Sequence, residues 1–225
     1  MHAHWLPNID DGAKSLDETL SMLRAFVDLG YDSLIATPHV MADYYPNTPK
    51  DIRERLEEVR ELTQREGLPL TLSAAAEYMI DDQFEAHMAE HGLLTLPGNR
   101  LLIEFGFLAA PAGLDGVLFR LQAADYTLVI AHPERYTYFH QQPAVWRQFH
   151  DRGIKLQVNV LSLVGHYGSR VQSVAQQLVK EGLVSMIGTD AHHTDHLRAA
   201  AKVLKNRKVA SLLAKSVFDN KTLVA

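Results

Sequence analysis

Histidine and acidic residues recur along this chain in short motifs whose residue types and spacing could bind metal ions. The chain contains 12 His and no Cys. The candidate ligands are His2, His4, Asp10, Asp11, His39, Glu77, Glu104, His132, Asp190 and His192. Ligands of these types suit Zn, Mn or Fe, and a supply of roughly nine side chains suits two or three ions. Two ions about 3.5–4 Å apart can activate a water and clamp a phosphate, so the set predicts hydrolysis of phosphate esters.

Each of these motifs has a simple structural explanation when it is taken alone. The pair of His2 and His4 could arise by chance, His132 could cap a strand, and Asp190 could cap the helix that follows it. The combination is different, because six predicted strands carry a His or a carboxylate at the same end. Buried carboxylates without partners are unfavourable, and bound cations would pair their charges and hold the imidazoles as neutral ligands. The combination therefore favours a metal site.

The elements that would position these side chains alternate between strands and helices. Strands are predicted over residues 2–6, 32–37, 68–76, 101–105, 126–131, 154–160 and 183–188. Helices are predicted over residues 15–29, 49–66, 82–91, 112–124, 144–152 and 169–181, and over most of the chain from His196. Apolar strands separated by helices predict a parallel sheet covered by helices, either open or closed as a barrel. No linker-like segment divides the chain, so one domain over residues 1–225 is expected.

The first two predicted helices have recognisable ends. Ser15, with Glu18 three residues later, forms a capping-box pattern, and Gly30 is the glycine expected after the last turn. Thr48 followed by Pro49 predicts the start of the second helix. These boundaries place the candidate ligands at strand ends and in loops, and in barrels of this type functional side chains gather at the carboxyl ends of the strands.

The composition excludes several classes of protein. Without Cys, disulfides, thiolate nucleophiles and Cys-based zinc sites are excluded. The formal net charge of -5 and the lack of a basic stripe argue against binding of nucleic acid. The one short basic cluster, interpreted as a solvated helix face, is Lys202, Lys205, Arg207 and Lys208. No apolar run approaches the roughly 20 residues that span a bilayer, and no signal peptide is recognisable, so a cytoplasmic protein without membrane insertion is expected.

Five motifs together resemble those of the polymerase and histidinol phosphatase (PHP) superfamily. They are His2-x-His4, Thr37-Pro38-His39, Ile103-Glu104-Phe105, His132-Pro133-Glu134-Arg135-Tyr136 and Gly188-Thr189-Asp190-Ala191-His192. Within the superfamily, residues 7–13 and the segments 157–162 and 165–168 resemble the bacterial metal-dependent protein-tyrosine phosphatases of capsule and exopolysaccharide synthesis. The likeness covers essentially the whole chain, and its motifs are specific in combination.

This resemblance implies a distorted (β/α)7 barrel with a site for three ions, usually manganese or iron. The metal ligands that it implies are His2, His4, Asp11, His39, Glu77, Glu104, His132, Asp190 and His192. Asp11 is preferred to Asp10 because of its position in the motif. Arg135 matches an arginine of the family that contacts substrate, and Arg198 is a looser match to a second one. The implied substrate is a phosphotyrosine protein, the C-terminal tail of a bacterial tyrosine kinase.

The activity expected from these features is hydrolysis of a phosphate monoester without a covalent enzyme intermediate. A metal-bound hydroxide, on ions held in part by Asp190 and His192, would attack phosphorus in line. Arg135 and Arg198 would bind the non-bridging oxygens. Three alternatives stay open: a histidinol-phosphate or other small-molecule phosphatase, a nuclease-type phosphodiesterase, and a non-enzymatic, metal-stabilised module that binds phosphotyrosine. The acidic net charge disfavours the nuclease, and the full ligand set disfavours the module.

The N-terminal segment departs from the family pattern in two ways. Position 8 is Asn where the family usually has Gly, a change that a turn with positive φ tolerates. The chain also begins almost at His2, so the first strand would be short. His2 and His4 would then lie on a fraying end, and weaker metal binding there is expected.

Overall fold

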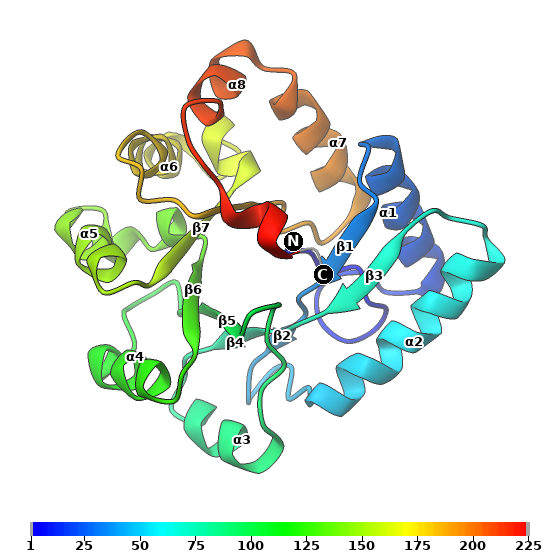
Figure 1. Cartoon of the computed structure of the whole chain (residues 1–225), viewed down its shortest axis with the longest axis horizontal. Coiled ribbons are helices and arrows are strands. Elements are labelled where there is room, and N and C mark those ends of the chain that lie inside the picture. Colours follow the sequence, from blue (N-terminus) through cyan, green and yellow to red (C-terminus); the bar gives the residue numbers. More distant parts are fainter. Residues whose placement is uncertain (1, 224–225) are drawn as a thin grey trace.

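Eight short parallel strands form the centre of the computed structural model, which describes residues 2–223 (Figure 1). They are β1 (Ser33–Ala36), β2 (His39–Val40), β3 (Thr71–Ala74), β4 (Glu77–Met79), β5 (Arg100–Glu104), β6 (Thr127–Ala131), β7 (Lys155–Asn159) and β8 (Met186–Gly188). One sheet has the order β2-β4-β5-β6-β7-β8, and β1 pairs with β3 in a second sheet. Because every pairing between two of these strands is parallel, the predicted α/β fold with parallel strands is confirmed.

A short break follows each of two predicted strands, and beyond each break lies a second strand that the sequence does not predict. The sequence predicts single strands over residues 32–37 and 68–76, whereas in the structure β1 is followed by β2, and β3 by β4. Pro38 lies in the first break and has no N–H to donate, although its carbonyl accepts a hydrogen bond from the Glu77 backbone at 3.0 Å. The parallel register is unchanged across the break, and His39 pairs with Glu77 directly after it. The continued register therefore brings these two candidate ligands side by side.

The N-terminal segment is held between two parts of the chain that are distant in sequence. Residues 2–6 form no regular strand, but Ala3 makes an isolated parallel bridge with Ala191. The Thr37 N–H donates to the Ala3 carbonyl at 2.9 Å, and the His4 N–H donates to the Ala191 carbonyl at 2.9 Å. The structure thus differs from the expected fraying end, since hydrogen bonds on both sides and full burial of the side chains fix this segment.

Helices surround the strands, and their positions follow the predicted ones closely (Figure 1). They are α1 (Leu16–Asp28), α2 (Pro49–Arg65), α3 (Phe84–His91), α4 (Leu114–Ala123), α5 (Ala144–Asp151), α6 (Ser169–Lys180), α7 (Thr194–Leu204) and α8 (Arg207–Leu213). The predicted caps form, since Ser15 Oγ accepts from Glu18 N at 3.2 Å and Thr48 makes a capping box with Asp51. Within residues 2–223, no helix is both long and apolar enough to cross a membrane.

Candidate metal centre

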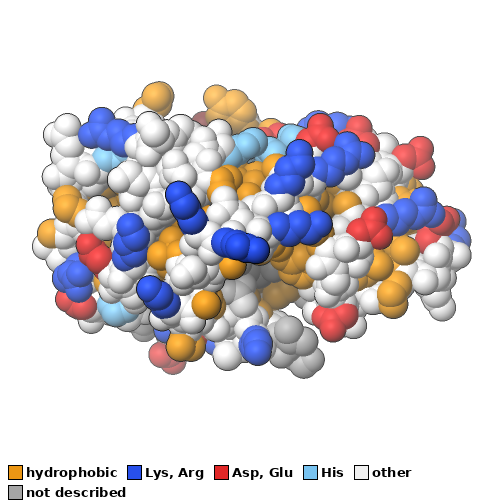
Figure 2. Space-filling model, turned by 90° about the horizontal axis from the view of Figure 1, so that it is seen from above, with side chains coloured by type: hydrophobic (Ala, Val, Ile, Leu, Met, Phe, Trp, Pro, Cys, Tyr) orange, Lys and Arg blue, Asp and Glu red, His pale blue; other side chains and the backbone are white. Residues whose placement is uncertain are grey.

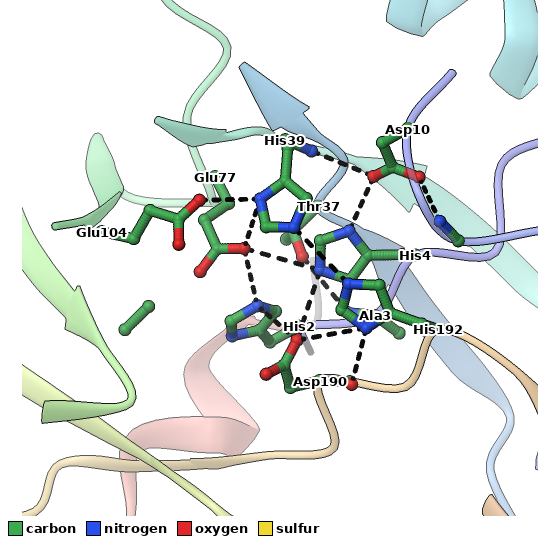
Figure 3. A network of polar contacts seen from close by, with 12 residues as sticks. His2, Ala3, His4, Asp10, Thr37, His39, Glu77, Glu104, Asp190 and His192 are labelled. Carbon is green, nitrogen blue, oxygen red and sulfur yellow. Dashed lines mark hydrogen bonds and ion pairs between the residues drawn. The ribbon is translucent and has the colours of Figure 1, made fainter. Parts of the chain in front are cut away.

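The carboxyl side of the sheet brings all nine predicted ligands together, and Figure 3 shows His39, Glu77 and Glu104 facing the imidazoles of the N-terminal segment. His39 is the first residue of β2, Glu77 is the first of β4, and Glu104 is the last of β5. His132 directly follows β6, and Asp190 lies just beyond β8. The loops and the N-terminal segment supply His2, His4, Asp11 and His192. His39 and Glu77 also lie just beyond the ends of β1 and β3, so the parallel arrangement brings all of these side chains to the same side of the strands.

Three groups of facing ligand atoms can be distinguished in this cluster. They are His2, His4, Glu77 and Asp190; His4, Asp11, His39 and His192; and His39, Glu77 and Glu104. Within a group, the atoms lie within 4.8 Å of one another. In the first group, His2 Nε2 is 3.1 Å from Glu77 Oε2, and His4 Nε2 is 3.4 Å from Asp190 Oδ1. Because His4, His39 and Glu77 each belong to two groups, the three groups adjoin one another.

Seven atoms of the candidate ligands are buried and have no hydrogen-bond partner among the described residues. They are His2 Nε2, His4 Nε2, His39 Nδ1, Glu77 Oε2, Glu104 Oε1, His132 Nδ1 and Asp190 Oδ1. Buried polar atoms are nearly always paired, and leaving one unpaired costs about 1–3 kcal/mol. Imidazole nitrogens and carboxylate oxygens are the donors that Zn, Mn and Fe accept. The residues present therefore fit a centre of divalent metal ions.

Three of the candidate ligands have a left-handed backbone, which residues other than Gly rarely adopt. The angle φ is 59° at His2, 33° at His132 and 50° at Asp190. Such conformations cost about 1–3 kcal/mol each and concentrate at functional sites, where the surrounding structure imposes them.

His132 belongs to none of the three groups, but its Nε2 lies 3.0 Å from Glu77 Oε1 and 3.8 Å from Glu104 Oε2. It therefore borders the third group.

The carboxylates change the proton affinity of the imidazoles that they surround. Burial disfavours a charged ring at His4, but Asp10, Asp190 and Glu77 together outweigh burial and hold the pKa of His4 well above its ordinary value. At His39, burial is outweighed by Glu104 and Glu77, which raise the pKa to about 9. Burial also opposes ionisation of Glu77, yet the surrounding imidazoles keep the pKa of this carboxyl well below its usual range. The cluster therefore favours positive charge, whether carried by protons or by metal ions.

Binding of divalent cations at pH 7 is expected to release protons from the imidazoles. The raised pKa values of His4 and His39 mean that both rings are positively charged at this pH. Each ring must lose one proton before it can bind a metal ion. Metal affinity should therefore rise from pH 6 to pH 9 and fall as the pH falls. Calorimetric titration with Mn²⁺ in two buffers of different ionisation enthalpy is expected to show about one proton or more released per chain. A heat of binding that is the same in both buffers would contradict this expectation.

The structure gives different surroundings to the two adjacent aspartates. Asp10 is buried, and its Oδ2 accepts from His4 Nδ1 at 2.7 Å and from the His39 N–H at 3.0 Å. Asp11 faces the ligand cluster, with Oδ1 at 3.2 Å from His192 Nε2 and 3.4 Å from His39 Nε2. Asp10 thus orients ligands from behind, as carboxylates beside metal-binding histidines commonly do, and Asp11 has the position of a ligand.

A pocket of about 520 Å³ opens over the ligand cluster. Its lining residues outside the ligand set are Met41, Tyr44, Tyr45, Phe107, Arg135, Tyr167, His193 and His196. The Arg135 guanidinium packs on two rings, 4.5 Å from the centre of Phe107 and 4.7 Å from that of Tyr167, and its Nη1 donates to Asp190 Oδ2 at 3.1 Å. Arg135 is therefore fixed beside the ligands. A larger depression of about 830 Å³ between α4 and α5 contains none of the candidate ligands.

Arg198 is not brought to this pocket. Its side chain is 72% exposed, and Nη1 donates to Asp195 Oδ1 at 2.7 Å, one turn earlier on α7. It is absent from the residues that line the pocket. The helical phase of α7 directs this side chain into solvent, so the geometry gives no support to the predicted role of Arg198 in substrate binding.

Two side chains at the site belong to the segment 157–162 that resembles the family, but the sequence assigns them no role at the metal centre. Gln157 and Asn159 lie two residues apart on β7, so both face the same side of the sheet. Gln157 Oε1 contacts His2 Nδ1, and Asn159 Nδ2 donates to Asp190 Oδ2 at 2.7 Å. The period of the strand could have shown that the two amides share a face, but not that they reach the ligands.

The fold and the site together define a metal-dependent enzyme of the parallel α/β class. Buried imidazoles and carboxylates gather at one edge of a parallel sheet, beneath a pocket that also holds an arginine. The chain belongs to the family of capsular polysaccharide synthesis proteins CpsB/CapC, whose family model matches residues 1–223. The resemblance to the capsule-type branch of the PHP superfamily is thereby confirmed.

Individual relatives agree with this family. The tyrosine-protein phosphatase YwqE of Bacillus subtilis (strain 168) is 31% identical over 229 residues, which cover 100% of this chain and 90% of YwqE. The tyrosine-protein phosphatase CpsB of Streptococcus pneumoniae is 25% identical, with 98% of this chain and 95% of CpsB covered. A chain from the crystal structures of YwqE and CpsB, described as unique metal-dependent tyrosine phosphatases, superposes with a TM-score of 0.82 at 31% identity, over 94% of this chain and 87% of that chain.

Proposed function

We propose that this chain is a metal-dependent phosphatase that hydrolyses phosphotyrosine in proteins. One observation carries the proposal: buried imidazole nitrogens and carboxylate oxygens without hydrogen-bond partners converge beneath a pocket that contains Arg135. The relatives named as tyrosine phosphatases support both the activity and the assignment as an enzyme. Membership of a capsular polysaccharide synthesis family supports a role in that process.

The residues of the site divide into those that hold metal and those that hold substrate. The three groups suit two or three divalent ions, with Mn as the first choice and Fe or Zn as alternatives, and Asp190 and His192 belong to that ligand set. When bound, such ions lower the pKa of a coordinated water and neutralise charge on phosphate oxygens. Arg135 has the planar fork that donates two parallel N–H bonds to a phosphate, and stacking on Phe107 and Tyr167 limits its rotation.

Three finer assignments extend the proposal. The substrate is the C-terminal tail of a bacterial tyrosine kinase, which accords with the family to which the chain belongs. The compartment is the cytoplasm, which accords with the absence of Cys. The two sheets close into one distorted (β/α)7 barrel, in which the hydrogen bonds of Ala3 and His4 to Thr37 and Ala191 join β1 to the segment after β8.

Turnover of a phosphotyrosine peptide by the Mn²⁺-loaded protein is the direct test of the proposed activity. The peptide is expected to be hydrolysed faster than histidinol phosphate or bis(p-nitrophenyl) phosphate, which represents phosphodiesters. Chelation should remove the activity and Mn²⁺ should restore it, because the chain has no Cys and an attacking thiolate is excluded.

The other outcomes of this experiment separate the alternatives. Faster hydrolysis of histidinol phosphate would favour a small-molecule phosphatase, and faster hydrolysis of the diester would favour a phosphodiesterase. A metal-replete protein that hydrolyses none of the three esters but binds the phosphopeptide would favour a non-enzymatic module.

An aromatic wall of the pocket is expected to give preference for aryl phosphates. Tyr45 lines the pocket, and its ring stacks over that of His39 with centroids 5.9 Å apart. Tyr45→Ala should lower kcat/KM for a phosphotyrosine peptide by roughly 2- to 10-fold, because one aromatic contact contributes about 0.5–1.5 kcal/mol. Hydrolysis of a phosphoserine peptide should be unchanged, and Tyr45→Phe should behave like the unaltered protein. Equal losses on both peptides would show that Tyr45 acts on the site as a whole.

A further inference from the structure

A chain of hydrogen bonds through two amide side chains of β7 joins His2 to Asp190. His2 Nδ1 contacts Gln157 Oε1, Gln157 Nε2 donates to Asn159 Oδ1 at 2.9 Å, and Asn159 Nδ2 donates to Asp190 Oδ2 at 2.7 Å. All four side chains are buried, with exposed fractions of 2% or less. We call these four residues the His2–Asp190 network.

The direction of every hydrogen bond in the His2–Asp190 network follows from its acidic end. The Asp190 carboxylate only accepts, so Asn159 must present its NH₂ group to it and its oxygen to Gln157. Gln157 must then present its NH₂ group to Asn159 and its oxygen to His2. An amide oxygen also only accepts, so His2 Nδ1 must carry a hydrogen. The lone pair of a neutral His2 ring is therefore on Nε2.

His2 Nε2 is the atom that faces the candidate metal centre. It lies 3.1 Å from Glu77 Oε2 and 3.4 Å from Asp190 Oδ1, and it has no hydrogen-bond partner among the described residues. The tautomer imposed through Gln157 is thus the one that a metal ligand requires at this atom. The opposite tautomer would direct an N–H at the neighbouring ligands.

The same network determines which oxygen of Asp190 stays free. Oδ2 accepts from Asn159 Nδ2 at 2.7 Å and from Arg135 Nη1 at 3.1 Å. Oδ1 accepts no hydrogen bond within residues 2–223 and lies 3.4 Å from both His2 Nε2 and His4 Nε2. Because both donors bind Oδ2, Oδ1 remains directed at His2 and His4, which belong to the same ligand group as Asp190.

The surrounding structure is shaped to hold the two amides. A Cβ at Gly188 would lie 2.5 Å from Gln157 Nε2 and 2.8 Å from Gln157 Cδ, so only Gly leaves room for this amide. The Asn159 N–H donates to Glu134 Oε1 at 2.9 Å, and the same oxygen accepts from Ser162 Oγ at 2.6 Å. Gly188 on β8 thus leaves room for the Gln157 amide, and Glu134 in the segment after β6 fixes the backbone that carries the Asn159 amide.

We infer that Gln157 and Asn159 are positioning residues, which prepare His2 Nε2 and Asp190 Oδ1 for metal binding without contacting the metal. The inference rests on the proposed metal-dependent function, because it concerns the affinity of the proposed centre. The inference differs from a packing role for Gln157. The network needs a hydrogen-bond acceptor for His2 Nδ1 at this position, and a side chain of the right volume is not sufficient.

Two substitutions of Gln157 separate the network from simple packing. Gln157→Met keeps the volume and removes the acceptor, so Mn²⁺ affinity is expected to fall about 10- to 100-fold. Gln157→Glu keeps an acceptor for His2 Nδ1, and in its neutral form it also donates to Asn159, so affinity should stay within about threefold of the unaltered protein. A packing role predicts the reverse order, because Met is apolar and Glu can introduce a buried charge. Gln176→Met is the matched control, since the Gln176 amide donates to the Leu163 carbonyl outside the network.

Competition with a chromogenic chelator measures Mn²⁺ affinity without reference to activity. Long-range ¹H–¹⁵N correlation spectra of the Zn²⁺-loaded protein, labelled at His, report which ring nitrogen of His2 carries the hydrogen. A hydrogen on Nδ1 in the unaltered protein and in Gln157→Glu, together with the affinity order given above, supports the inference. If Gln157→Met fails to fold, Asn159→Leu takes its place, because Leu has a similar volume but lacks the NH₂ group that occupies Asp190 Oδ2, so Mn²⁺ binding should weaken.

Three results would overturn the inference. Gln157→Met that binds Mn²⁺ as well as Gln157→Glu or Gln176→Met does would remove the need for an acceptor. A hydrogen on His2 Nε2 in the unaltered protein would contradict the direction of the network. If the unaltered protein binds Mn²⁺ and hydrolyses phosphotyrosine, each of these first two results rejects the inference and leaves the proposed function intact. An unaltered protein that does neither rejects the proposed function and the inference together.

Discussion

Replacement of Glu77 by Gln is expected to abolish phosphatase activity and to reduce the number of bound metal ions, while the fold survives. Glu77 Oε2 lies 3.1 Å from His2 Nε2, 3.5 Å from His4 Nε2 and 3.2 Å from His39 Nδ1, so one oxygen faces two of the three ligand groups. The amide of Gln is uncharged and a weak metal ligand. Loss of several kcal/mol of charge stabilisation corresponds to a fall in kcat/KM of about 10³-fold or more.

The measurements for Glu77→Gln are steady-state turnover, metal content by mass spectrometry, and circular dichroism. The fold should persist because Gln has nearly the shape of Glu and the β4 backbone keeps its pairing with β2 and β5. Glu85→Gln is the matched control, since Glu85 is an exposed carboxylate that pairs with Arg120 at 2.6 Å outside the site. Near-normal turnover by Glu77→Gln with a full complement of ions would falsify the assignment of Glu77 as a shared ligand.

The positions of the candidate ligands could be predicted because parallel βα units leave few places for them. His39, Glu104 and His132 each lie next to a predicted strand end, and all parallel strands end at the same edge of the sheet. The hydrophobic pattern therefore placed these residues together without knowledge of any contact. Their burial followed from the same argument, because only a cation makes so many buried carboxylates and imidazoles favourable.

The N-terminal segment could not be predicted in the same way. Local sequence indicated a short strand with a fraying end, but the order of this segment depends on hydrogen bonds to Thr37 and to Ala191, at opposite ends of the chain. The break at Pro38 is similar, since it leaves the Thr37 N–H free to bond to Ala3 instead of a strand neighbour. Long-range pairing decided both features, and no local propensity encodes it.

The adjacent aspartates show how a tight turn divides two roles that the motif alone could only rank. A Cβ at Gly12 would lie 2.0 Å from the His4 carbonyl oxygen, so the chain can pass close to His4 only because residue 12 is Gly. This close approach places Asp10 behind His4, where its Oδ1 also accepts from the Gly12 N–H at 2.9 Å, and it directs Asp11 to the other side. The division of roles therefore depends on backbone geometry.

Roles that depend on side-chain direction were the least predictable. Arg198 matches the family only loosely, and the phase of α7 pairs it with Asp195 instead of directing it to the pocket. Tyr167 and Phe107, which pack on Arg135, come from separate loops and have no shared pattern in the sequence. Such contacts arise from the three-dimensional arrangement, and aromatic residues in loops are too common to identify them.

Replacement of Arg135 by Ala is expected to lower kcat/KM for a phosphotyrosine peptide by about 10²- to 10³-fold, the loss typical when one donor to a charged transition state is removed. The pocket holds the Arg135 guanidinium at 3.1 Å from Asp190 Oδ2, with Phe107 and Tyr167 against its faces. Arg135→Lys should recover only part of the loss, because an ammonium keeps the charge but not the planar fork or the stacking. Metal content should be unchanged, since Asn159 still occupies Asp190 Oδ2.

Arg198→Ala provides the matched comparison on the same chain, because both arginines were predicted to bind phosphate and only Arg135 lines the pocket. The Arg198 side chain is 72% exposed and paired with Asp195. An exposed ion pair of this kind contributes little to the stability of the fold. The kcat/KM of Arg198→Ala is expected to stay within about twofold of that of the unaltered protein, because the exposed ion pair contributes so little. A large loss with Arg198→Ala and a small one with Arg135→Ala would reverse the assignment, and it would mean that α7 moves toward the pocket when substrate binds.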